Sequence, residues 1–140
     1  MTERDLDLLP HRPPMRLVEQ IDDVVPGHSA RGRRVAHPTD WYFQGHFPGA
    51  PVVPAIVLVE LLAQTGGFAA ATTIGDQQRA QRLRVAALGP FKFPGGAGPN
   101  MTLEAVARIV GRMGGLIKIE GEVTADGVVV ASGSVTLAET

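Results

Sequence analysis

One apolar stretch, residues 52–71, constrains the fold of this chain more than any other feature. From Pro54 it reads Pro-Ala-Ile-Val-Leu-Val-Glu-Leu-Leu-Ala-Gln-Thr-Gly-Gly-Phe-Ala-Ala. This pattern predicts one long helix with Pro54 in its first turn, where the missing N–H of proline costs nothing. Because the helix would be apolar on nearly every side, the protein must bury almost all of it. Only Glu60, Gln64 and Thr65 interrupt the apolar surface.

The same stretch is long enough to suggest a membrane span, but its polar residues oppose that interpretation. Glu60 and Gln64 lie near its middle, and Gly66-Gly67 follows. A carboxylate at the centre of a bilayer costs about 2.5–3.5 kcal/mol on insertion scales. We therefore expect a helix that is buried in protein, and no membrane partner.

Short segments of alternating apolar and polar residues predict strands on both sides of this helix. We expect residues 1–16 to be a helical or irregular lead and residues 72–81 to be a loop. Turns are expected at Pro26-Gly27, at residues 111–115 and at Asp126-Gly127. The expected strands span residues 17–25, 29–36, 83–93 (broken at Gly89-Pro90), 101–110, 116–124 and 128–137. A single apolar helix needs the concave face of a curved, mostly antiparallel sheet around it, so the fold class is α+β.

Length and composition indicate one domain over residues 1–140. The absence of cysteine excludes disulfides, thiol nucleophiles and thiolate metal sites. The four histidines show no ligand spacing, so we expect no metal. The net charge is −1 and no dense Lys/Arg run is present, so we expect no nucleic acid partner. The charged N-terminus, Met-Thr-Glu-Arg-Asp, lacks the apolar run of a signal peptide, and we expect a cytoplasmic protein.

Two side chains near the start of the predicted helix could exchange protons with a substrate. Burial raises the pKa of a carboxyl, so Glu60 could stay protonated near neutral pH and act as a general acid. His46 follows Gly45 and precedes Pro48-Gly49, which would hold its imidazole in place as a general base. Taken one at a time, each residue also has a purely structural interpretation. Glu60 could hydrogen-bond to Gln64, and His46 could cap a turn.

The start of the helix supplies a third component. The backbone N–H groups of a first helical turn are unpaired and favour negative charge, and the N–H of Ala55 directly follows Pro54. A base, an acid and an oxyanion donor together specify proton abstraction next to a carbonyl, with loss of a β-hydroxyl group.

The same residues resemble the signature of the β-hydroxyacyl-acyl carrier protein dehydratases. Residues 45–54 read Gly-His-Phe-Pro-Gly-Ala-Pro-Val-Val-Pro, and Glu60 and Ala63-Gln64 follow at the family's spacing. Residues 9–12 (Leu-Pro-His-Arg) and 91–93 (Phe-Lys-Phe) resemble the family in the same order. The resemblance implies a hotdog fold, in which a curved antiparallel sheet wraps around one long central helix.

The resemblance also implies roles for individual residues. His46 would remove the C2 proton of a β-hydroxyacyl thioester, Glu60 would protonate the departing C3 hydroxyl, and the Ala55 N–H would bind the thioester carbonyl. Other residues implied at the site are Gly49 and Gln64 for substrate positioning, and Phe43, Phe47, Phe91 and Lys92 along the acyl or pantetheine tunnel. The substrate would be carried on the phosphopantetheine of an acyl carrier protein, or on coenzyme A, without any other cofactor. The pathway would be fatty-acid or related polyketide-like biosynthesis, and His46 and Glu60 would come from different subunits of a homodimer, or of a trimer of such dimers.

The sequence departs from the family pattern at Ala55, where glycine is usual, at Pro13 and Arg16, and at residues 94–100. Two alternatives stay open at this point. A hotdog acyl thioesterase would use a carboxylate to activate water and would not need His46. A dehydratase-like subunit without activity would bind acyl chains or act as a scaffold.

Overall fold

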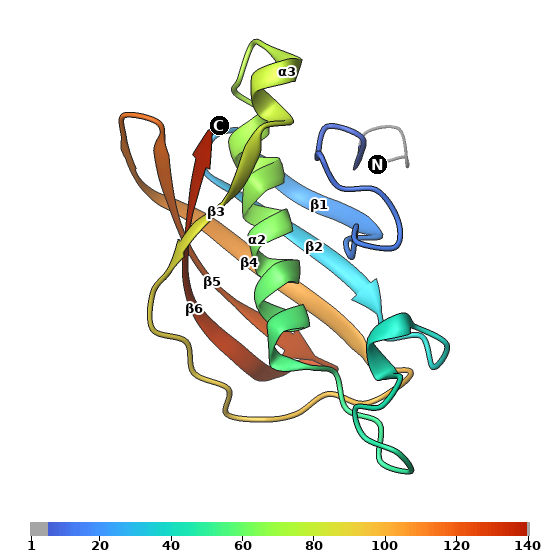
Figure 1. Ribbon diagram of the computed structural model, residues 1–140. Coiled ribbons are helices and arrows are strands. Elements are labelled where there is room, and N and C mark those ends of the chain that lie inside the picture. Colours follow the sequence, from blue (N-terminus) through green and yellow to red (C-terminus); the bar gives the residue numbers. More distant parts are fainter. Residues whose placement is uncertain (1–5, 140) are drawn as a thin grey trace.

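The predicted apolar helix lies across the concave face of one curved sheet (Figure 1). The computed structural model describes residues 6–139, so the first part of the expected N-terminal lead lies outside the described residues. Helix α2 spans Ala55–Ala71, and two short helices flank it, η1 at Trp41–Phe43 and α3 at Gln77–Ala80. The strands are β1 (Gln20–Val25), β2 (Ser29–Val35), β3 (Leu83–Leu88), β4 (Thr102–Met113), β5 (Leu116–Ala125) and β6 (Val128–Glu139).

All six strands belong to one sheet with the order β1-β2-β4-β5-β6-β3. Every neighbouring pair is antiparallel, including β2 and β4, which pair from Ser29↔Arg108 to Val35↔Thr102 although α2 and β3 lie between them in the sequence. Strands β1 and β3 form the two edges. The predicted α+β hotdog fold is therefore confirmed. Among residues 6–139, no helix is long and apolar enough to cross a bilayer.

The core lies between α2 and the sheet. Alternate residues of the strands face the helix: Leu103 and Ala105 of β4 and Ile119 and Val123 of β5 are fully buried. Close contact between helix and sheet depends on Gly66, because a Cβ there would lie 2.5 Å from the Cδ1 of Ile119. From Val57 onward every α2 side chain is buried except that of Glu60, which is half-buried.

The prediction placed the start of α2 and of β1 too early. Pro54 is extended (φ −59, ψ 141) and stands just before the helix, because Val53 donates its N–H to the carbonyl of Ala97 at 2.8 Å. The first strand begins at Gln20 because the N–H groups of Leu17 and Val18 point to a side chain of α2 instead of to β2.

Local contacts explain how three further segments compare with the predicted boundaries. The expected loop after α2 contains α3, whose first N–H groups are satisfied in part by the Asp76 carboxylate, which accepts from the N–H of Gln78 at 2.9 Å. Strand β4 continues to Met113 through a bulge, so the turn is shorter than expected. The Asp126-Gly127 hairpin is confirmed, with φ values of 46 and 86.

Gly121 of β5 should tolerate no larger side chain. A Cβ at this position would collide with the backbone carbonyl of Val106 and would lie 2.7 Å from the Cδ1 of Leu62. We expect Gly121→Ala to lower the free energy of unfolding by about 1–3 kcal/mol, as overpacking does, in urea denaturation. The control is Gly115→Ala, whose Cβ would meet nothing within 4 Å. Equal stability of the two variants would contradict this packing.

Candidate active site

A tight loop between η1 and α2 carries His46. Gly45 and Gly49 have φ values of 77 and 75, which glycine adopts without strain. The His46 N–H donates to the carbonyl of Phe43 at 3.1 Å, and its carbonyl accepts from Val52 at 2.9 Å. The backbone of His46 is therefore held on both sides, as the sequence suggested.

The orientation of the His46 ring determines which nitrogen can act as a base. Its Nδ1 lies 3.0 Å from the carbonyl oxygen of Val52. A carbonyl oxygen can only accept, so Nδ1 carries the hydrogen and Nε2 keeps its lone pair. The ring is half-buried and stacks on Phe47 at 4.3 Å. Nε2 is thus the atom of His46 that could accept a proton.

The first turn of α2 presents unpaired N–H groups beside this loop. No side chain caps the helix at Pro54, and the first backbone bond inside the turn runs from Val57 N–H to the Pro54 carbonyl at 2.9 Å. Ala55 and Ile56 are both exposed. The N–H of Ala55 can therefore meet an oxyanion at the positive end of the helix dipole.

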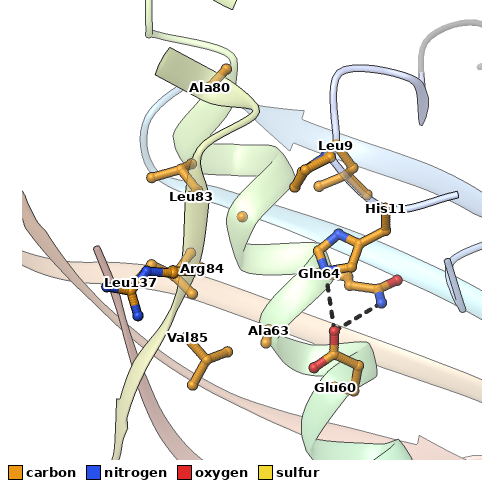
Figure 2. A pocket seen from close by; sticks show the side chains of 12 residues that line it. Leu9, His11, Glu60, Ala63, Gln64, Ala80, Leu83, Arg84, Val85 and Leu137 are labelled. Carbon is orange, nitrogen blue, oxygen red and sulfur yellow. Dashed lines mark hydrogen bonds and ion pairs between the residues drawn. The ribbon is translucent and has the colours of Figure 1, made fainter. Parts of the chain in front are cut away.

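Glu60 lies one and a half turns further along α2, at the wall of a small pocket (Figure 2). Its Oε1 accepts a hydrogen bond from Nε2 of Gln64 at 3.0 Å, which confirms the contact that the sequence allowed between these two residues. The same Oε1 is 3.2 Å from Nε2 of His11, and both side chains of this pair are 27% exposed. Its Oε2 accepts no hydrogen bond from residues 6–139.

Gln64 is buried and holds Glu60 in a fixed orientation. Its Oε1 accepts from the N–H of Leu17 at 2.8 Å, and its Nε2 donates to the carbonyl of Met15 at 2.8 Å. The backbone partners settle which end of the amide is which, so the group that faces Glu60 is a donor. Gln64 therefore binds the N-terminal segment and Glu60 together, and its role toward a substrate stays a prediction.

The expectation that burial keeps Glu60 un-ionised is wrong for the single chain. Desolvation raises its pKa, but the hydrogen bonds from His11 and Gln64 oppose desolvation, and the pKa lies below the usual value. The sequence pattern showed the burial of Glu60 but not the two donors that meet it. Glu60 is therefore mainly a carboxylate near neutral pH.

One chain does not bring the two predicted proton carriers together. The pocket beside Glu60 has a volume of about 30 Å³ and His46 does not line it. No hydrogen bond or ion pair joins His46 to Glu60 within residues 6–139. The residues that line the pocket are mostly apolar and come from the N-terminal segment, α2, α3, β3 and β6: Leu9, Pro10, His11, Glu60, Ala63, Gln64, Gly67, Ala80, Leu83, Arg84, Val85 and Leu137.

The four residues expected along a tunnel fall into two separate groups. Phe43 is buried beside Tyr42, whereas Phe47 is 57% exposed. Phe91 covers Gly133 of β6, where a Cβ would lie 2.5 Å from its ring, and Lys92 pairs with Ser132 of the same strand. None of the four lines the pocket beside Glu60. A tunnel through these residues stays a prediction.

His11 is the residue of this site to which sequence reasoning gave no role. The available signal was the Leu-Pro-His-Arg segment at residues 9–12, which contributed to the family resemblance. Arg16, one of the departures, is buried and its guanidinium lies 3.0 Å from the Asp7 carboxylate. No group of three potential metal ligands occurs among the described residues.

A half-buried polar cluster lies at the start of the loop that carries His46. Arg34 and Asp40 form an ion pair at 2.7 Å with side chains 12% and 11% exposed, and the Tyr42 hydroxyl donates to the same carboxylate. Desolvation raises the pKa of Asp40, but the guanidinium of Arg34 and the hydroxyl of Tyr42 hold it below its usual value. Desolvation together with the bond to Asp40 raises the pKa of Tyr42 to about 12.

Tyr42 is the only tyrosine of the chain, so its ionisation can be measured directly. We expect the tyrosinate absorbance of the folded protein to appear with a midpoint near pH 12, against about 10 for a free side chain. A group whose pKa is raised by folding stabilises the folded state fully below its unfolded pKa. The stability contributed by Tyr42 should therefore be lost as the pH rises from about 10. A midpoint near 10 in the folded protein would contradict the Asp40 contact.

Comparisons with other proteins agree on one family. A family model described as a FabA-like domain matches residues 9–134. The chain is 35% identical over 126 residues to the 3-hydroxyacyl-[acyl-carrier-protein] dehydratase FabZ of Syntrophotalea carbinolica, covering 90% of this chain and 85% of that protein. The protein of the same name from Proteus mirabilis is also 35% identical and covers 89% and 87%.

Solved structures with the same fold carry different functional names. A chain of the dehydratase heterocomplex ApeI:P from Xenorhabdus doucetiae has a TM-score of 0.81 at 17% identity, covering 96% of this chain and 90% of that one. A putative thioesterase from Ralstonia eutropha has a TM-score of 0.66 at 22% identity and covers 85% and 83%. At these identities the similarity shows the fold alone.

Proposed function

Because the chain belongs to the FabA-like family, we propose that it is a hydro-lyase that removes water from a β-hydroxyacyl thioester on acyl carrier protein. The product is a trans-2-enoyl thioester, and the setting is fatty-acid biosynthesis. Curated relatives named as dehydratases, similar over most of the chain, support this function. The structural observations that support it are an imidazole on His46 whose Nε2 is open and a carboxyl on Glu60 whose Oε2 is open, although one chain leaves the two groups apart.

The proton transfers follow from these two atoms. His46 Nε2 takes the C2 proton while negative charge moves to the thioester oxygen, which the Ala55 N–H stabilises. The C3–O bond then breaks as Glu60 Oε2 delivers its proton, and water leaves. His46 ends protonated and Glu60 ends ionised, so exchange with solvent restores both. Since the elimination involves no net oxidation or reduction and the enzyme only transfers protons, the proposal includes no cofactor.

Because the pKa of Glu60 is lowered, dehydration and hydration differ in how much of the required form of Glu60 is present. Dehydration draws on the small protonated fraction of Glu60, whereas hydration of an enoyl thioester starts from the ionised form that predominates. In that direction Glu60 takes a proton from the attacking water and protonated His46 returns a proton to C2. Hydration is therefore the more sensitive assay of the proposed chemistry.

We propose a homodimer in which His46 of one subunit serves Glu60 of the other, because one chain leaves the site incomplete. Exposed apolar side chains near both groups support this arrangement. Phe47 is 57% and Ile56 65% exposed beside the His46 loop, and Val85 and Leu88 are exposed on the edge strand β3. A trimer of such dimers is the larger form of the same proposal. A fully active monomer in sedimentation would contradict it.

An acidic carrier protein is the proposed partner, with coenzyme A thioesters as the alternative carrier. Between Arg79 and Lys118 the sequence has seven basic residues and one acidic residue. Such a segment attracts an acidic partner through long-range steering. A cytoplasmic location stays part of this proposal, since a chain without cysteine has no disulfide that would need an oxidising compartment.

One assay separates this function from the two alternatives. Purified protein is given a short trans-2-enoyl thioester, and enoyl absorbance and free thiol are followed together. A dehydratase consumes the enoyl absorbance by hydration and releases no thiol. A thioesterase releases thiol, and a scaffold does neither. Thiol release without hydration would overturn the proposed function.

A further inference from the structure

His11 and Gln64 meet the same oxygen of Glu60. The amide of Gln64 is fixed by backbone groups at both ends, so it donates to Oε1. His11 Nε2 lies 3.2 Å from that oxygen and reaches it from the N-terminal segment (Figure 2). With two donors on Oε1, the carboxyl has one oxygen turned into the protein and the other, Oε2, left for a ligand.

Only one of the two ring nitrogens of His11 has a polar partner in the described chain, and that partner is Glu60. The Nδ1 of His11 is buried and has no hydrogen-bond partner among residues 6–139. An Nδ1–H there would be a buried donor without an acceptor, which costs more than a lone pair without a donor. The tautomer that fits carries its hydrogen on Nε2, facing Glu60.

The backbone on both sides of His11 is held in place. One Nη1 of Arg12 donates to the carbonyl of Leu9 at 2.6 Å and to that of His11 at 2.8 Å. Leu9 is buried in the core. His11 therefore reaches α2 from a segment that cannot easily turn away, although it lies far from Glu60 in the sequence.

We propose that His11 is a positioning residue of the reaction, which orients the Glu60 carboxyl through its Nε2–H so that Oε2 is the atom that exchanges the proton with substrate. This inference rests on the proposed function. In dehydration the Oε2–H bond breaks, its proton leaves with the C3 hydroxyl as water, and the resulting carboxylate is stabilised at Oε1. His11 keeps its own proton throughout. Arg84, from β3, is the one other charged residue that lines this pocket in the described chain.

Three variants separate the hydrogen bond from the shape of the side chain. His11→Phe keeps a ring without a donor, His11→Ala removes both, and His11→Gln places an amide N–H where Nε2 lies. We expect the first two to lower kcat of enoyl hydration by about 10- to 100-fold with KM nearly unchanged, as for one lost hydrogen bond to a charged group. His11→Gln should recover most of the loss.

The chain offers a matched control. His37 and Glu19 form a second histidine–glutamate pair, 2.8 Å apart, near the edge of the sheet and away from the pocket beside Glu60. His37→Phe and His37→Ala should leave kcat and KM of hydration unchanged. Equal losses in the His11 and His37 variants would indicate a general structural effect and would overturn the proposal.

The pH profile supplies a readout that a purely structural role would not move. Hydration needs ionised Glu60, so activity rises with pH through its pKa. Loss of the His11 donor raises that pKa, and the acid limb of kcat/KM should move to higher pH in His11→Phe and His11→Ala but much less in His11→Gln. The assigned role would be overturned if the acid limb of kcat/KM stayed at the same pH in folded His11→Phe or His11→Ala. It would also be overturned if His11→Gln failed to recover activity.

Carbon NMR titration of the Glu60 carboxyl tests the contact without any turnover. We expect the same upward shift of its pKa in the donor-free variants, and Glu60→Gln identifies the resonance. If the His11 variants show this shift but the wild-type protein never hydrates an enoyl thioester, the dehydratase function is refuted and the contact between His11 and Glu60 stands. An unchanged pKa would refute the His11 proposal even in an active enzyme.

Discussion

Replacing His46 by alanine is expected to lower the turnover of enoyl hydration by at least about 100-fold, the usual minimum effect of losing a general acid or base. The proposed reaction has one group placed to exchange the C2 proton, because Nδ1 of His46 is occupied by the Val52 carbonyl and Nε2 is left to act. Steady-state hydration kinetics at several pH values measure the loss.

His28→Ala is the control for this substitution. His28 is exposed in the turn between β1 and β2, outside the pocket beside Glu60, and should be dispensable. Near-normal turnover of His46→Ala, with intact secondary structure by circular dichroism, would remove the role of base from His46.

Glu60→Gln is expected to have an effect of similar size, at least about 100-fold on kcat. The amide can still accept the hydrogen bond from Gln64, so the shape of the site is kept, but it can neither ionise nor deliver a proton to substrate. Single-turnover hydration separates this chemical loss from any change in thioester binding.

A matched control for Glu60→Gln is Glu122→Gln, since Glu122 lies on β5 and contacts Arg108 at 3.5 Å, outside the pocket beside Glu60. It should hydrate at the wild-type rate. A Glu60→Gln chain that keeps a tenth or more of the wild-type kcat would assign the proton to another group. The His11 proposal would then lose the residue on which it depends.

Local sequence patterns predicted the architecture of this chain well, because its strongest signals are local. The apolar run around Leu61 and Leu62, the alternation in β5 and the Asp126-Gly127 turn each depend on neighbouring residues, and all three are confirmed. The wrapped sheet followed from the need to bury one helix on nearly all sides.

The predictions that were wrong concern residues whose contacts are far apart in the sequence. The first strand is shorter than expected because Gln64 of α2 binds the N–H groups of Leu17 and Val18. Glu60 is ionised because His11 reaches it from the N-terminal segment. No spacing rule connects these positions, so a pattern could mark Glu60 as a candidate acid without showing how its charge is set.

The departure at Ala55 also has a local reading in the structure. Its side chain is exposed at the start of α2, and its N–H stays uncapped, so the donor that the family resemblance implies is retained. The methyl group adds bulk where the proposed thioester oxygen would approach, so an effect of Ala55 on turnover or substrate choice stays a prediction.

A site shared between two copies of the chain, with His46 from one copy and Glu60 from the other, can be tested by subunit mixing. The inactive variants His46→Ala and Glu60→Gln are co-expressed with different tags, and the mixed dimers are isolated through both tags. Each mixed dimer has one site with both groups intact, so we expect about half of the wild-type hydration activity. Verified mixed dimers that stay as inactive as either parent would contradict a site shared between subunits.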